Sequence, residues 1–130
     1  MIISKNLSSF FRWFLFLSFA LLLYFFFTFP PDQIPPLLIR ANDKALHFLN
    51  FLLLALFGFR AFFHSSHPLF SAQADKKATS LSFGYSVFLE WAQSGVPGRD
   101  PSFWDLVANA GGIFAALLTI WLSKKSAFHS

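Results

Sequence analysis

Six polar side chains of this chain form three pairs with helical spacing. The pairs are Asp43 with His47, Glu90 with Gln93, and Asp105 with Asn109. Residues three or four positions apart lie on one face of a helix, so each pair would present its two side chains together. Carboxylate, imidazole and amide groups can hydrogen-bond a polar ligand, and the first two can also transfer protons. The chemistry that these residues offer is therefore ligand binding or acid–base catalysis.

Two basic residues accompany these pairs. Lys44 directly follows Asp43, and Arg99 ends the stretch Gly-Val-Pro-Gly-Arg, whose glycines and proline predict a tight turn. This turn lies between the last two pairs, so we expect it to direct the Arg99 guanidinium back toward them. Ammonium and guanidinium groups are suited to holding phosphate or carboxylate.

A structural role explains Glu90 least well. It lies near the C-terminal end of an apolar segment, where the helix dipole disfavours a carboxylate. An ionisable group inside a bilayer costs roughly 3 kcal/mol and usually marks function. We therefore predict a partner for Glu90 among His47, Arg99 and Lys44. A purely structural ion pair with His47 or Arg99 is the open alternative.

The other residues also have structural alternatives. Asp43 falls at a predicted helix N-terminus, where a carboxylate is favoured, and Asp105 follows Ser102 at the capping-box spacing. Arg99 could be an interfacial arginine whose head reaches water. Asn109 could form an interhelical hydrogen bond and nothing more.

Four apolar stretches would position these residues, at about 10–29, 44–63, 78–93 and 103–122. A spanning helix needs about 20 apolar residues. Serines dilute the third stretch, but irregular backbone cannot cross hydrocarbon, so it too is predicted as a helix. Of all residues, 55% are hydrophobic and 12% charged, which is about half the charged share of a soluble domain.

The predicted fold is an all-α membrane protein: a single domain of residues 1–130 built as a bundle of four transmembrane helices. Small residues recur every four positions in the fourth stretch, at Ala108, Gly112 and Ala116. Such a face predicts close helix packing, which would draw the polar helix ends together.

The basic residues predict the orientation of the bundle, because Lys and Arg accumulate in cytoplasmic connections. Seven fall on the side of the termini: Lys5, Arg12, Arg60, Lys76, Lys77, Lys124 and Lys125. Three fall on the opposite side: Arg40, Lys44 and Arg99. Both termini are therefore predicted to be cytoplasmic, with the polar pairs at the outer membrane face.

The ordered motifs resemble the signature of the VanZ-like family, a group of small bacterial integral membrane proteins named for a teicoplanin-resistance accessory protein. The matching motifs are Asp43-Lys44-x-x-His47-Phe48, Glu90-x-x-Gln93, Pro97-Gly98-Arg99 and Asp105-x-x-x-Asn109-x-x-Gly112, and the resemblance covers residues 43–118. It implies a multi-pass protein of the bacterial cytoplasmic membrane, with a link to the envelope or to the glycopeptide response. It supplies no mechanism.

One function that fits is a binding site at the outer face for a lipid-linked envelope precursor or a phospholipid headgroup. Its ligand-binding residues would be Asp43, Lys44, Gln93, Arg99 and Asn109. The two basic groups would hold phosphate or carboxylate, and the amides would bond amide or hydroxyl groups of the ligand.

A second function is a membrane enzyme acting on such a substrate, with His47, Glu90 and Asp105 as its catalytic residues. His47 would be the general acid or base, oriented by Asp43 or Asp105, and Glu90 would be a second base. No serine or cysteine lies in a nucleophile motif, so water attack or a metal ion would be needed. Asp43, His47, Glu90 and Asp105 could hold a divalent ion. Because no short metal motif is present, we predict neither a metal site nor a cofactor.

A third function is that of a structural or accessory subunit, in which the polar cluster only locks three helices together. The partner that composition predicts is the lipid bilayer. Nucleic acid is not predicted, because the basic residues form no continuous stripe. One polar cluster at one face also gives no continuous path for a channel.

Overall fold

The computed structural model describes residues 2–37 and 43–129, and within them it contains helices and no strands. The elements in chain order are α1 (Ile2–Thr28), the short 3-10 helix η1 (Pro31–Gln33), α3 (Asp43–Phe63), α4 (Pro68–Ser71), α5 (Ala74–Ser94) and α6 (Phe103–His129). The all-α class predicted from the sequence is confirmed for these residues. Arg40, which entered the charge count, lies outside the described residues.

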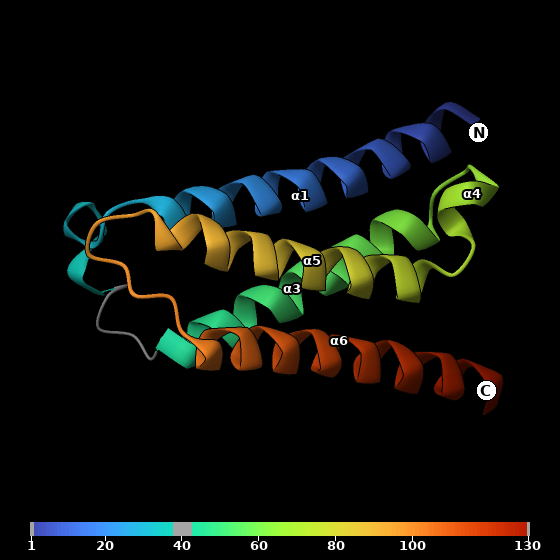
Figure 1. The fold of residues 1–130 in the computed structure, drawn as a ribbon. Coiled ribbons are helices and arrows are strands. Elements are labelled where there is room, and N and C mark those ends of the chain that lie inside the picture. Colours follow the sequence, from blue (N-terminus) through green and yellow to red (C-terminus); the bar gives the residue numbers. More distant parts are fainter. Residues whose placement is uncertain (1, 38–42, 130) are drawn as a thin grey trace.

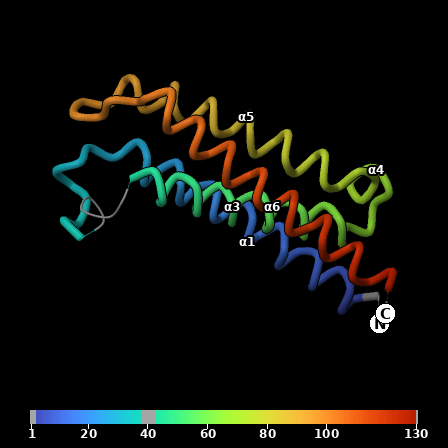
Figure 2. The backbone as a smooth tube through the Cα atoms, turned by 90° about the horizontal axis from the view of Figure 1, so that it is seen from below, coloured from blue at the N-terminus to red at the C-terminus, as the bar shows by residue number. Residues whose placement is uncertain are grey.

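The four long helices run alternately up and down along a common direction (Figure 1). The start of α1, the end of α6 and α4 lie at one end of the bundle. The opposite end holds η1, the start of α3, the end of α5 and the start of α6, and it is called the polar end below. A view turned by 90° gives the same division (Figure 2).

All four predicted helices are longer than their apolar stretches, α3 by a single residue. α1 and α6 each have 27 residues, and α5 has 21. The additions to α1 and α6 are the polar ends 2–9 and 123–129. A helix satisfies its backbone hydrogen bonds internally, so it can continue past the apolar stretch into polar sequence.

By length and composition, α1, α3 and α6 are able to cross a membrane. Their outer faces are covered with exposed large apolar side chains, including Phe10, Phe14, Leu21, Phe114 and Leu118. A water-soluble surface rarely carries so large an apolar area. The chain therefore has the character of a membrane protein. α5 is not among the three helices, because its serines, its lysines and the polar residues Glu90 and Gln93 lower its hydropathy.

The core lies around α3, which packs against α1, α5 and α6. Fully buried side chains on its inner faces include Phe51, Leu54 and Ala55. Leu89 of α5 and Ala116 of α6 are buried against the same core. Because α3 touches all three other long helices, its first turns bring the polar residues of α5 and α6 into one place.

Helices α3 and α6 approach each other closely at Gly112. A Cβ atom at this position would lie 2.1 Å from the carbonyl oxygen of Phe48 and 2.9 Å from the amide nitrogen of Leu52. Only a residue without a side chain fits against this backbone. The close packing predicted from the small residues of the fourth stretch is confirmed at Gly112, and Ala116 is also fully buried.

Candidate functional site

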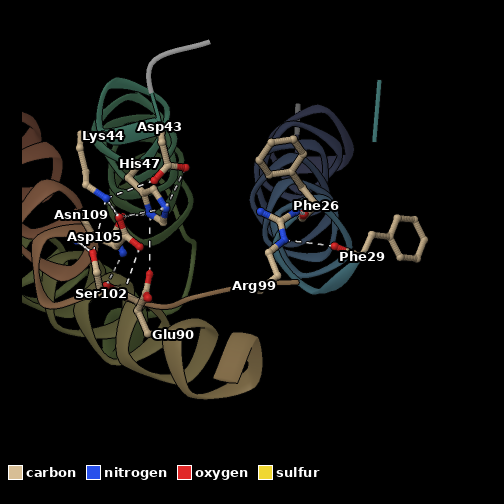
Figure 3. Close-up of polar contacts among 11 residues, drawn as sticks. Phe26, Phe29, Asp43, Lys44, His47, Glu90, Arg99, Ser102, Asp105 and Asn109 are labelled. Carbon is tan, nitrogen blue, oxygen red and sulfur yellow. Dashed lines mark hydrogen bonds and ion pairs between the residues drawn. The ribbon is translucent and has the colours of Figure 1, made fainter. Parts of the chain in front are cut away.

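The three sequence pairs meet at the polar end of the bundle. Asp43 begins α3, Glu90 and Gln93 lie in the last turns of α5, and Asp105 belongs to the first turn of α6. Five of the six paired side chains are buried: His47, Glu90, Gln93, Asp105 and Asn109. Asp43 and the adjacent Lys44 are exposed. Figure 3 shows these side chains, Gln93 apart, directed toward one another from the three helices.

His47 is at the centre of this cluster, with only 2% of its surface exposed. Its Nδ1 atom lies 2.8 Å from Oδ1 of Asn109, whose Nδ2 in turn donates to Oγ of Ser86 at 2.9 Å. An amide oxygen can only accept, so Nδ1 of His47 carries the hydrogen. This chain of hydrogen bonds joins α3, α6 and α5 and fixes the imidazole ring.

The second ring nitrogen of His47 faces two carboxylates. Nε2 lies 3.7 Å from Oδ1 of Asp43 and 3.8 Å from Oδ1 of Asp105. Both distances are longer than a hydrogen bond. The ring also packs on Phe27 of α1, with the ring centres 4.7 Å apart. The imidazole is therefore positioned as an oriented base between two carboxylates.

Asp105 has two functions at once. Its backbone nitrogen donates to Oγ of Ser102 at 3.2 Å, and its Oδ2 accepts from the Ser102 nitrogen at 3.3 Å, so the predicted capping box is confirmed. Its Oδ1 pairs with the Lys44 ammonium group. Lys44 also contacts Oδ2 of Asp43 at 3.2 Å. Capping and membership of the polar cluster are thus compatible in this residue.

Glu90 lies on the other side of His47. Its Oε1 is 3.7 Å from Nδ1 of His47, which makes His47 the nearest of the three partners predicted for it. Its Oε2 is buried and has no hydrogen-bond partner among residues 2–37 and 43–129. A buried oxygen without a partner costs about 1–3 kcal/mol, and more when it is charged.

Arg99 differs from the prediction. Its Nε donates to the Phe29 carbonyl at 3.2 Å and its Nη2 to the Phe26 carbonyl at 2.9 Å, so the side chain is next to α1 and not next to Glu90 (Figure 3). The last carbonyls of a helix lack partners within the helix, and they compete for the guanidinium. Burial lowers the pKa of Arg99, and the Asp43 carboxylate opposes this shift. Gly98, at φ +79°, provides the left-handed conformation of the turn before it.

A cavity of about 280 Å³ separates Arg99 from the cluster. Its polar lining consists of Asp43, His47, Gln93, Arg99, Asp100 and Asp105. The remaining wall is largely apolar and includes Phe26, Ile34 and Leu46. The cavity thus combines acceptors, donors and one oriented imidazole with apolar side chains, and Arg99 lies on its α1 side.

Three of these residues could hold a metal ion. Asp43, His47 and Asp105 each offer one ligand atom, and these atoms lie within 4.8 Å of one another. They come from the start of α3 and the start of α6, so no short sequence motif joins them.

Sequence reasoning missed two participants. Ser86 holds Asn109, and its position four residues before Glu90 on the same helical face was the available signal. Phe27 packs on the His47 ring, but α1 is apolar all round and its spacing gives no indication of which phenylalanine turns inward.

The motif residues of the sequence signature are thus close in space, with Asp43, His47, Gln93, Arg99 and Asp105 around one cavity. The chain was compared with protein-family models, with curated proteins and with solved structures, and none of the three comparisons gives a match.

Proposed function

We propose that this chain is a multi-pass, VanZ-like protein of the bacterial cytoplasmic membrane whose cavity binds the polar group of a membrane lipid. The ligand is a phospholipid headgroup or a lipid-linked envelope precursor. The observation that carries the proposal is the cavity of about 280 Å³ at the polar end, whose lining combines charged groups with apolar side chains. Small-molecule sites have volumes of about 300–1,000 Å³, so a headgroup fits and a whole lipid does not.

The proposal makes α5 a fourth transmembrane helix. Its polar side chains Ser82, Ser86, Glu90 and Gln93 are all buried within the bundle. Its exposed face carries Leu81, Phe83, Val87, Phe88 and Trp91. Polar groups inside a membrane protein face the bundle and not lipid, so this helix is compatible with a bilayer despite its lower hydropathy.

The distribution of basic residues supports cytoplasmic termini. Lys5 and Arg12 lie in the first half of α1, and Lys124 and Lys125 lie near the end of α6, at the end of the bundle opposite the cavity. Basic residues mark the cytoplasmic side, so the cavity opens at the outer face. This is the face at which envelope precursors become exposed, and it connects the site with the glycopeptide response that the family resemblance implies.

The chain has no cysteine, which makes its orientation easy to test. A single Gln33→Cys in η1 would label with a membrane-impermeant maleimide in intact cells. A single Ser66→Cys, in the connection before α4, would label only after permeabilisation. The reverse pattern would show that the cavity opens at the cytoplasmic face, and it would exclude ligands of the outer leaflet.

The roles of the lining residues follow from their chemistry. Arg99 and the Gln93 amide can donate to phosphate or carbonyl oxygens. The carboxylates of Asp43 and Asp100 can accept from hydroxyl or amine groups of a headgroup. The apolar wall formed by Phe26, Ile34 and Leu46 suits the first carbons of the lipid chains.

Binding is tested by the thermal stability of the purified full-length chain in detergent. A ligand that binds only the folded state raises the melting temperature. We expect a short-chain phospholipid to raise it and the matching diacylglycerol, which lacks the headgroup, to leave it unchanged. Gln93→Leu removes an amide from the cavity and should abolish the shift. Trp91→Leu, which changes an exposed residue of the same helix, should keep it. Equal shifts with both lipids, or in both variants, would contradict the proposal.

A second function, acid–base catalysis on the same ligand, is supported by the oriented imidazole of His47. Its Nδ1 is held by Asn109 at 2.8 Å. Its Nε2 faces Asp43 and Asp105, and these two residues line the cavity together with His47. Glu90, 3.7 Å from Nδ1, would be the second base. If the site is catalytic, Glu90→Gln should abolish turnover of the lipid while ligand binding and expression persist.

A further inference from the structure

We infer that Asp43, His47 and Asp105 form a binding site for a divalent transition-metal ion, such as Zn²⁺ or Mn²⁺, in the lining of the cavity. The three ligand atoms lie within 4.8 Å of one another. Nε2 of His47 is 3.7 Å from Oδ1 of Asp43 and 3.8 Å from Oδ1 of Asp105. Two ligand atoms bonded to one ion lie roughly 3–3.5 Å apart, so a small inward movement would complete the set. Asp43 is exposed at the helix start and is free to make it.

The protonation of His47 is suited to an ion. Since Nδ1–H donates to Oδ1 of Asn109, the neutral ring has its lone pair on Nε2, the atom that faces both carboxylates. The Lys44 ammonium group contacts both carboxylates, but it cannot accept the lone pair of Nε2, whereas a metal ion can bind all three ligand atoms. Metal-binding histidines commonly have their other nitrogen fixed by such a hydrogen bond, which sets the orientation of the ring. Asn109, held by Ser86, provides it here.

Glu90 adds a buried acidic group beside the opposite, Nδ1, edge of the His47 ring. Only 8% of its surface is exposed, it is directed at the His47 ring, and its Oε2 has no partner among the described residues. A buried carboxylate is retained when it balances a charge or serves in function. Among the described residues around the cavity and cluster there are four carboxyl groups and two basic side chains. The carboxyl groups belong to Asp43, Glu90, Asp100 and Asp105, and the basic groups to Lys44 and Arg99.

The side-chain groups available at this site determine which metal ions it can bind. One imidazole and two carboxylates suit Zn²⁺, Mn²⁺ or Fe²⁺, and no thiolate is available because the chain has no cysteine. Three protein ligands leave coordination positions open toward the cavity. An ion there would also reverse the local charge, so that a phosphate or carbonyl oxygen of the lipid could bind to it. This last step rests on the proposed function, whereas the ion site itself does not.

Lys44 competes with the ion. Its ammonium group pairs with Oδ1 of Asp105 and lies 3.2 Å from Oδ2 of Asp43. The Lys44 side chain is 48% exposed, so it can leave these carboxylates for water. Lys44→Met would remove the competitor without removing any ligand atom. It should therefore strengthen metal binding, which is the opposite of what a general loss of structure would do.

The test is direct titration of the purified full-length chain with Zn²⁺ by calorimetry and with Mn²⁺ by electron paramagnetic resonance. We expect one ion per chain with a Kd below about 100 μM, the weaker range of protein cation sites. Asp43→Asn should weaken binding at least about tenfold, as loss of a metal ligand does. Asp32→Asn, a matched change at an exposed carboxylate of η1, should leave it unchanged, and Lys44→Met should tighten it.

Two results would overturn the inference: no binding of either ion by the wild-type chain, or equal affinities of Asp43→Asn and Asp32→Asn. The lipid-stabilisation assay, repeated with and without a chelator, separates this inference from the proposed function. If the lipid raises the melting temperature but no metal ion binds, the lipid site is supported and the metal site is rejected. If a metal ion binds but the lipid does not change the melting temperature, the metal site is supported and the lipid site is rejected.

Discussion

The Nδ1 atom of His47 lies 2.8 Å from the Oδ1 atom of Asn109, and both side chains are almost wholly buried. This one contact joins α3 to α6 at the polar end and, through Ser86, joins both to α5. It also determines which edge of the imidazole faces the cavity. The site therefore depends on an amide that lines no part of the cavity itself.

Asn109→Leu should destabilise the protein by about 1–3 kcal/mol, because it leaves the His47 N–H and the Ser86 hydroxyl buried without partners. Thermal unfolding in detergent measures the loss. Asn6→Leu, at an exposed position of α1, is the control. Combining Asn109→Leu with His47→Phe should recover part of the stability, since both polar partners are then gone. An unchanged melting temperature for Asn109→Leu would show that the hydrogen bond is absent.

Gly112→Ala should destabilise the bundle by about 1–3 kcal/mol or prevent its assembly, because the new Cβ would meet the backbone of Phe48. Gly84→Ala is the matched control: a Cβ there has no neighbour within 4 Å. It should be neutral or stabilise the helix by up to about 1 kcal/mol. Chemical unfolding of both variants measures the difference, and the same sign for both would contradict the close α3–α6 contact.

Glu90→Leu should stabilise the protein by about 1 kcal/mol or more, because it removes a buried carboxylate whose Oε2 has no partner. Ser82→Ala removes a buried hydroxyl that also lacks a partner among the described residues, and it should have a smaller effect because a hydroxyl is neutral. A large loss of stability in Glu90→Leu would instead assign Glu90 the structural role.

Arg99→Gln should loosen the end of α1, since the guanidinium caps the carbonyls of Phe26 and Phe29. Hydrogen exchange of the amides in the last turn of α1 should become faster, while exchange in α6 stays unchanged. Arg60→Gln is the control, because Arg60 lies in the last turn of α3, at the end of the bundle away from Arg99. Unchanged exchange at the end of α1 would contradict the capping role.

His64 should make stability depend on pH. Burial, and then the charges of Arg12 and Arg60, lower its pKa from the ordinary value of 6.5. Below pH 6.5 the unfolded chain binds this proton before the folded protein does, so stability falls as the pH is lowered toward the folded pKa. His64→Gln should flatten the pH dependence of the melting temperature in this window. An identical slope in the variant would contradict the shift.

The spacing of residues made much of the site predictable. The pairs Asp43 with His47 and Asp105 with Asn109 each had to share a helical face, and the apolar stretches located the helices that carry them. Gly112 likewise indicated where α6 approaches another helix. These inferences are local or follow from periodicity, which a single sequence contains.

The sequence could not predict contacts in which one side chain has several possible partners. Arg99 bonds the free carbonyls of α1 and not Glu90, and the sequence does not rank these two acceptors. The helix ends at Ile2 and His129 lie beyond the apolar stretches, because backbone hydrogen bonding continues where hydropathy stops. The meeting of Asp43, His47 and Asp105 around one point required the relative placement of α3 and α6.

Native mass spectrometry in nanodiscs made from the membrane lipids of the source cell tests most directly whether the cavity holds a lipid. Wild type and the Trp91→Leu control should each retain one lipid species with an intact polar group, and Gln93→Leu should lose it while remaining folded. Retention of the same lipids by all three proteins, or of none by the wild type, would contradict a headgroup site at the polar end.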